Sequence, residues 1–160
     1  MIPKYLRALA DSSPRDVTLS RLLDLSKQLI GRPSYLAFLN EYPAAIEKLI
    51  GILNQSEWMA DYLSRYPILL DELIGAQLLD THFDWQELKR HLAYELRKAG
   101  NDVEAQMDLM RQVQHSFIFR LAMQELHQLW CVEDLSDQLA FLADILLETS
   151  LYQVWQNYQK

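Results

Sequence analysis

Four side chains in the second half of the chain have the types and the spacing that chemistry would use. Glu87 and His91 lie four residues apart, and so do Glu104 and Asp108. Residues four apart on a helix share one face, so either pair could hold a lone metal ion or act as an acid–base pair. A surface ion pair, or a carboxylate at the positive end of a helix, is the interpretation that we favour for both.

The residues of larger catalytic devices are missing from the sequence. Its glycines, Gly31, Gly51, Gly75 and Gly100, are isolated, so the chain has neither a P-loop nor a dinucleotide-binding fingerprint. A di-iron bundle needs a glutamate three residues before a histidine, and none of the histidines has one. The single cysteine, Cys131, excludes an internal disulfide and a Cys-based zinc site, and we expect it to be a small apolar side chain at a helix turn. We therefore assign no catalytic, cofactor-binding or metal-binding residue.

The charged residues restrict the partners. The chain has 15 Lys and Arg against 22 Asp and Glu, a net charge of −7. Because nucleic-acid binding needs clustered cations, we expect no nucleic-acid partner. Arg111 and Arg120 are nine residues apart, which places them about 180° apart around a helix. At least one of them should therefore lie near an interface or pair with a carboxylate.

Length and composition indicate the fold class. The 160 residues are 50% hydrophobic with 4 Gly and 5 Pro, which favours long helices over a sheet with many turns. We expect an all-α helical bundle forming a single domain over residues 1–160, with residues 1–15 as a poorly ordered arm. No apolar run reaches the roughly 18 residues of a membrane span. The N-terminus also lacks a secretory signal pattern, so we expect a cytosolic protein with no membrane partner.

The stretch from Ser56 to Gly75 predicts two short helices joined at a Tyr-Pro step. Ser56 can cap the first helix, and Pro67 ends it because a proline forces the residue before it out of helical geometry. Pro67 also suits the first turn of the next helix. The same construction occurs 24 residues earlier, around Tyr42 and Pro43, so two helix–Tyr-Pro–helix units stand in tandem.

The remaining helices are predicted from caps and apolar spacing. Asp16 is expected to cap a helix that ends at Gly31, and Asp84 one that runs to about Ala99. Asp102 should cap a long helix to about Trp130, and Asp134 another that runs almost to Lys160. These last two would form an antiparallel hairpin. The apolar lines expected to be buried are Leu19, Leu22, Leu23, Leu25, Leu29 and Ile30 in the first helix, Met107, Met110, Val113, Phe117 and Leu121 in the first long helix, and Leu135, Leu139, Leu142 and Leu146 in the second.

An ordered series of short motifs resembles the glutamine synthetase adenylyltransferase family, also called glutamate–ammonia ligase adenylyltransferase. The series covers most of the chain from about Leu19, and its segments are residues 35–43, Ser56 with Trp58, residues 66–67 and 69–73, Met110 with Arg111, residues 119–122 and residues 134–139.

The resemblance implies a much longer, two-part enzyme in which one half attaches AMP to a tyrosine of glutamine synthetase and the other removes it. This chain is similar to the helical segment that opens the attaching half. The family's catalytic signature, Gly-Ser followed by Asp-x-Asp, is absent here, so no catalytic residue is carried over. ATP and Mg²⁺ are implied for the parent enzyme. The implied partners are the adjoining nucleotidyltransferase domain, glutamine synthetase and a PII-type nitrogen signal protein.

The residues that we select for contact with another domain or a partner are Arg111, Arg120, Trp155 and Tyr158. If a domain boundary lies in the last helix, the face that carries Val154, Trp155 and Tyr158 should be partly uncovered. The alternative function is a free-standing helical interaction module. Its support is the presence of Met107, Met110 and Met123, because methionine adapts to many binding surfaces.

Overall fold

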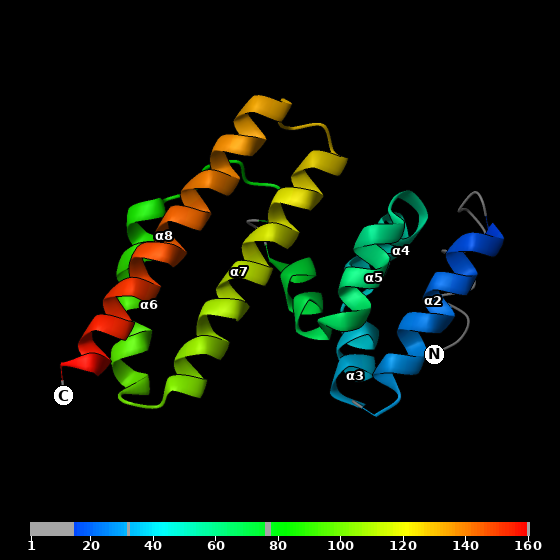
Figure 1. The fold of residues 1–160 in the computed structure, drawn as a ribbon. Helices are drawn as coiled ribbons and strands as arrows, with labels where there is room; N and C mark the ends of the chain where they lie inside the picture. The colour runs from blue at the N-terminus through cyan, green and yellow to red at the C-terminus, as the bar shows by residue number, and fades with distance from the viewer. Residues whose placement is uncertain (1–14, 32, 76–77, 160) are drawn as a thin grey trace. The chain divides into compact units, whose positions relative to one another are not determined.

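The computed structural model describes residues 15–31, 33–75 and 78–159, and in these ranges the chain forms helices and no strand (Figure 1). The all-α prediction is therefore confirmed. Nearly all of the predicted arm, residues 1–15, lies outside the described residues. The elements are α2 (Arg15–Leu29), α3 (Pro33–Glu41), α4 (Pro43–Gln55), α5 (Glu57–Arg65), the 3₁₀ helix η1 (Pro67–Ile74), α6 (Trp85–Ala99), α7 (Val103–Leu126) and α8 (Val132–Tyr158).

The backbone contacts divide the chain into two compact units. Unit 1 is Met1–Leu78 and unit 2 is Leu79–Lys160. In unit 1, α2 packs against α4 and α5, and η1 packs against both α4 and α5. In unit 2, α6 packs against α7 and α8. That residues 1–160 form a single domain stays a prediction.

The buried side of α2 is narrower than the sequence predicted. Thr18, Leu22, Leu25 and Leu29 are buried, and they follow steps of four, three and four along one side of the helix. Three of the leucine and isoleucine positions expected in the core are exposed instead. Each of them directly follows one of the buried residues and therefore lies about 100° further around the helix; they are Leu19, Leu23 and Ile30.

Both predicted Tyr-Pro steps are confirmed in unit 1. Tyr42 has φ −113° and ψ 82°, and Tyr66 has φ −125° and ψ 69°, so both leave helical geometry before a proline that begins the next helix. The second helix–Tyr-Pro–helix segment differs from the first in its last helix, η1, which is 3₁₀ and ends at Ile74, before Gly75. The α4 helix instead passes through Gly51 to Gln55.

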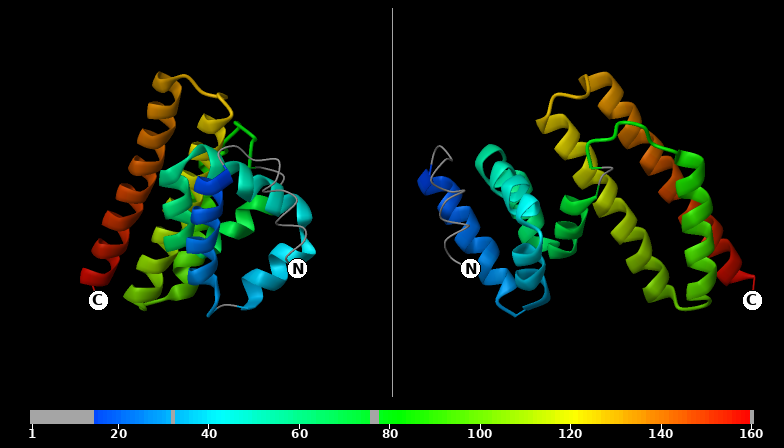
Figure 2. Two further views of the ribbon diagram at one scale, coloured as in Figure 1. Left: turned by 90° about the vertical axis from the view of Figure 1, so that its right-hand side faces the viewer. Right: turned by 180° about the vertical axis from the view of Figure 1, so that it is seen from behind.

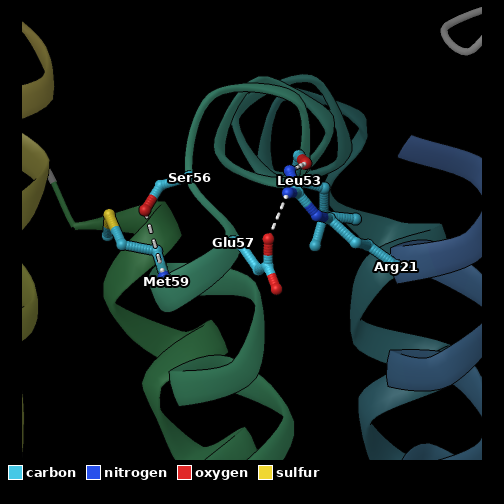
Figure 3. Close-up of polar contacts among 5 residues, drawn as sticks. All are labelled: Arg21, Leu53, Ser56, Glu57 and Met59. Carbon is cyan, nitrogen blue, oxygen red and sulfur yellow. Dashed lines mark hydrogen bonds and ion pairs between the residues drawn. The ribbon is translucent and has the colours of Figure 1, made fainter. Parts of the chain in front are cut away.

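A group of polar contacts fastens α2, α4 and α5 together (Figure 3). Ser56 caps α5 as predicted, because its Oγ accepts a hydrogen bond from the Met59 backbone N–H at 3.2 Å. From α2, the Arg21 guanidinium donates to the Leu53 carbonyl in the last turn of α4 at 2.7 Å. The same guanidinium pairs with the Glu57 carboxylate, at the start of α5, at 3.3 Å. One side chain of α2 thus holds the junction between α4 and α5.

Unit 2 contains the predicted antiparallel hairpin, formed by α7 and α8, with α6 alongside (Figures 1 and 2). Leu92 and Leu96 of α6 are buried together with Ile145 of α8. Partly buried side chains from the three helices complete this core; they are Trp85, Leu88, Leu109, Met110, Val113 and Leu146. Of the predicted α7 line, Leu121 is fully buried, whereas Met107 is exposed.

Two buried glutamines of α7 hold the connections on either side of α6. Gln106 Nε2 donates to the Gly100 carbonyl at 2.6 Å, after the end of α6. Gln124 Nε2 donates to the Asp80 carbonyl at 2.8 Å, before its start, and Gln124 Oε1 accepts from the Trp130 indole at 2.7 Å. Buried polar side chains are retained where their hydrogen bonds are made, as these are. Both connections of α6 are therefore tied to the same long helix.

Two caps in unit 2 are confirmed. The Asp84 carboxylate accepts from the Glu87 N–H at 2.8 Å, and the Asp102 carboxylate accepts from the Ala105 N–H at 3.0 Å. The end of α6 is confirmed as well, since Gly100 closes it with φ 60°.

The predicted end of α7 and the predicted start of α8 were wrong. The α7 helix ends at Leu126 because Gln128 takes φ 55° and Leu129 N–H donates to the Gln124 carbonyl at 3.0 Å, a helix-closing motif that usually carries glycine. The α8 helix begins two residues before Asp134, and its N-cap is Cys131. Cys131 is exposed, and its Sγ donates to Asp134 Oδ2 at 3.0 Å.

Candidate interaction surface

The two candidate acid–base pairs are surface charges of unit 2, as the favoured interpretation predicted. Glu87 lies in the first turn of α6 and pairs with Arg90 at 2.6 Å, and His91 is exposed. Glu104 lies in the first turn of α7, and Asp108 pairs with an arginine three residues further on. Across residues 15–31, 33–75 and 78–159, no group of three or more His, Cys, Asp or Glu side chains could hold a metal ion. These pairs therefore give no support for a metal site or for acid–base catalysis.

Arg111 lies on the exposed side of α7. Its Nη1 pairs with Asp108 Oδ1 at 2.9 Å, and more than half of its side chain is exposed to solvent. Burial of His115 and the nearby charge of Arg111 together lower the pKa of the His115 imidazole. Arg111 therefore belongs to a short charged row along one helix and is accessible to a partner.

Arg120 lies in a different environment, against aromatic rings of its own unit. Its guanidinium carbon is 4.9 Å from the ring centroid of Phe83 and 5.4 Å from that of Phe117. Phe83 also stacks on Trp85 and Trp130, with ring centroids 5.2 and 6.4 Å away. A cation over an aromatic face is stabilised by the ring quadrupole. Arg120 thus contributes to the internal packing of unit 2, and no pattern in the sequence predicted this aromatic cluster.

Trp155 and Tyr158 lie on a strongly exposed apolar face of α8. Only the part with Val154, Trp155 and Tyr158 was predicted from the sequence. Five large apolar side chains with exposed fractions between 62% and 88% lie along the second half of the helix; they are Leu147, Leu151, Val154, Trp155 and Tyr158. We call this set the outer stripe of α8.

The outer stripe faces away from the core of unit 2. At 100° per residue its members fall within an arc of about 100°, and this arc is centred roughly opposite Leu142, Ile145 and Leu146. Leu142 and Ile145 are buried, and Ile145 belongs to the cluster with the α6 leucines. The predicted uncovered face of Val154, Trp155 and Tyr158 is confirmed. The spacing of Leu147, Leu151, Val154 and Tyr158, in steps of four, three and four, was a readable signal for a larger stripe.

A groove of about 600 Å³ lies between α6 and α8 on another side of unit 2. Its lining mixes cations, a carboxylate and amides with apolar carbon; the lining side chains include Lys89, Leu96, Arg97, Glu148, Tyr152 and Gln156. Lys89 and Glu148 pair with each other across the groove at 2.6 Å. The lining offers hydrogen-bonding groups and charges for binding, and the charge of Lys89 is already neutralised by Glu148.

The methionines that supported an interaction module do not gather on one surface. Met107 is exposed, Met110 is half-buried and its Sδ accepts from Ser150 Oγ at 3.4 Å, and Met123 is buried. Two of the three therefore fill the interior of the protein.

The part of the chain that the structure describes contains no helix long and apolar enough to cross a membrane.

The family model and the relatives that match this chain name the same kind of enzyme, an adenylyltransferase. The family model described as glutamate-ammonia ligase adenylyltransferase matches residues 46–160. A relative from Neisseria meningitidis serogroup A is 50% identical over 160 residues, and one from Chromobacterium violaceum is 41% identical over 157 residues. Each is named bifunctional glutamine synthetase adenylyltransferase/adenylyl-removing enzyme. The matches cover 100% and 98% of this chain but only 18% of each relative, so the chain spans less than a fifth of their length.

Proposed function

Because this chain belongs to the glutamate-ammonia ligase adenylyltransferase family, we propose that it is a helical, non-catalytic piece of a bifunctional enzyme. The whole enzyme would attach AMP to a tyrosine of glutamine synthetase and remove it again, and would thereby regulate nitrogen assimilation. The observation that carries this proposal is the combination of 50% identity over the whole chain with coverage of only 18% of the relative.

The chemistry of the described residues supports a non-catalytic role. The sequence has no Gly-Ser followed by Asp-x-Asp, and its carboxylates and histidines form no metal-binding group within the described ranges. A nucleotidyltransferase would need carboxylates close together to hold Mg²⁺ against the ATP phosphates. ATP and Mg²⁺ therefore belong, in this proposal, to a nucleotidyltransferase domain outside the chain.

The role of the helices would be to orient that domain. Unit 2 is suited to this role because the connections before and after α6 are fixed to α7 by Gln124 and Gln106. Arg111, Trp155 and Tyr158 are its exposed candidates for contact with the adjoining domain, with glutamine synthetase or with a PII-type signal protein. Arg120 is a weaker candidate because its guanidinium already lies over Phe83 and Phe117.

The test is an AMP-transfer assay with purified glutamine synthetase, ATP and Mg²⁺. The 160-residue chain should transfer no AMP, whereas the longer polypeptide that contains it should label glutamine synthetase. The matched control is the longer polypeptide with the aspartates of its Asp-x-Asp signature changed to asparagine. Transfer by the 160-residue chain alone would refute the non-catalytic role.

The second candidate function is a free-standing helical interaction module, and the exposed outer stripe of α8 is the observation that favours it. The two candidates differ in the native reading frame beyond Lys160. A frame that continues into a nucleotidyltransferase domain supports the first, and an immediate stop codon supports the second.

A further inference from the structure

The outer stripe of α8 is an apolar surface that the other described parts of unit 2 leave uncovered. Its five side chains are Leu147, Leu151, Val154, Trp155 and Tyr158, each more than three-fifths exposed. Trp and Tyr alone present on the order of 150–250 Å² each when fully exposed, so the stripe offers roughly 500 Å² of apolar surface. Apolar patches of this size on a soluble protein are often functional.

The size of the stripe argues against a second copy of the chain as its occupant. A stable interface between separate proteins buries about 800 Å² on each partner, which is more than the stripe supplies. Interfaces between domains of one polypeptide begin at about 600 Å² in total. They can be smaller because the covalent link raises the effective concentration of the two surfaces. The relatives extend far beyond the aligned segment, which is 18% of their length, so such a surface within the same polypeptide is available in them.

The charges of α8 also favour a partner of different composition. Glu133, Asp137 and Asp144 lie on the same side of α8 as the stripe, in the first half of the helix. The helix has five acidic residues and no Lys or Arg; the acidic residues are Glu133, Asp134, Asp137, Asp144 and Glu148. A second copy would bring the same negative charges, whereas a surface with Lys or Arg along one rim would complement them.

We infer that the outer stripe of α8 is the docking face for another part of the same polypeptide, an apolar surface with basic residues on the rim that faces Asp137 and Asp144. This inference rests on the proposed function, because it requires the chain to be a piece of a longer enzyme. Docking there would fix the orientation of α8 relative to that part of the enzyme.

Hydroxyl-radical footprinting of Trp155 and Tyr158 tests the inference. The 160-residue chain and the longer polypeptide are labelled separately, at the same concentration and without glutamine synthetase. Trp155 and Tyr158 should be modified severalfold more slowly in the longer polypeptide, and Trp58 of unit 1, which is 53% exposed, serves as an internal reference.

A pair of variants separates docking from a general effect on the helix. Leu151→Glu in the longer polypeptide should weaken docking by roughly tenfold, because it removes a large apolar side chain from the centre of the stripe, and should restore the labelling of Trp155. Ala140→Glu is the matched control. Ala140 is exposed on the same side, eleven residues earlier and about 20° away, and its variant should leave the labelling slow. Asp144→Lys should increase Trp155 labelling because it places a positive charge opposite the basic rim, and unchanged labelling would refute a basic rim.

Three results would overturn the inference. Equal labelling of Trp155 in both proteins would show that the stripe stays open. Protection that appears only when glutamine synthetase is added would make the substrate protein the occupant. Protection in the 160-residue chain that grows with concentration would make a second copy the occupant. If the longer polypeptide still transfers AMP in any of these cases, the proposed function stands and only the docking inference fails.

Discussion

Removal of the Arg21 guanidinium should loosen unit 1 far more than removal of its ion-pair partner. The variant Arg21→Met keeps an unbranched aliphatic side chain at this position and removes the charged guanidinium. Two interactions disappear together, the bond from Nη1 to the Leu53 carbonyl at 2.7 Å and the pair with Glu57 Oε2 at 3.3 Å. The structure predicts that these two interactions contribute very unequally to stability.

The difference follows from exposure. The Arg21 side chain is 20% exposed, and the Leu53 carbonyl lies in the last turn of α4, where no helical N–H follows to satisfy it. Loss of a largely buried hydrogen bond from a charged donor costs about 1.5–2 kcal/mol. The Glu57 side chain is 80% exposed, so its ion pair is screened by solvent, and Glu57→Gln should cost about 0.5 kcal/mol.

Hydrogen exchange of the α4 and α5 amides is the assay, because the rate ratio gives the change in opening free energy. Arg21→Met should accelerate exchange of the most protected amides roughly 10- to 30-fold, and Glu57→Gln about twofold. The α6, α7 and α8 amides in the same sample serve as the internal control. Equal acceleration by the two variants would show that the ion pair, and not the carbonyl bond, holds the junction. An effect of Arg21→Met below about twofold would refute the reasoning altogether.

The other predictions concern a glycine and two titrating groups. Gly100→Ala should destabilise unit 2 by about 1–3 kcal/mol in urea unfolding, because the backbone at Gly100 has φ 60° although a methyl group there would meet nothing within 4 Å. Gly31→Ala, which also meets nothing within 4 Å, is the control and should be nearly neutral. Burial raises the pKa of Tyr62 to about 12, so the unfolding free energy should fall as the pH rises from about 10 to 12, since the unfolded chain loses this proton first; a tyrosinate absorbance titration should show the step, and Tyr62→Phe should remove it. Burial and the charge of Arg111 lower the pKa of His115, so the unfolding free energy should fall as the pH drops below 6.5; Arg111→Gln should raise the His115 pKa in an NMR titration, and an unchanged value would contradict the assigned electrostatic contribution.

The sequence by itself determined the features that depend on near neighbours. The caps at Ser56, Asp84 and Asp102 were predicted correctly, because each cap is a hydrogen bond to a backbone N–H three residues further on. The two Tyr-Pro steps were predicted for the same reason, since proline restricts the residue directly before it. The family resemblance also came from local motifs in a fixed order, and the comparisons support it.

Local signals were insufficient where a residue adopts a conformation that its type does not favour. Gln128 has φ 55° and closes α7, although glycine is the usual residue at such a position, so the sequence predicted a helix that was too long. Cys131 is the N-cap of α8 although its side chain makes no capping hydrogen bond, so the sequence predicted that the helix starts at Asp134 instead.

Tertiary structure alone decided which side chains lie in the core and which remain available for contact. Leu25 is buried and Leu23 is exposed, because only Leu25 lies on the side of α2 that faces the other helices of unit 1. Arg120 meets Phe83, 37 residues earlier in the chain, whereas Trp155 meets solvent. A cap or a proline acts within a few residues of itself. Burial of a side chain instead depends on helices that come together from distant parts of the chain, and no local pattern specifies which helix will pack against that side chain.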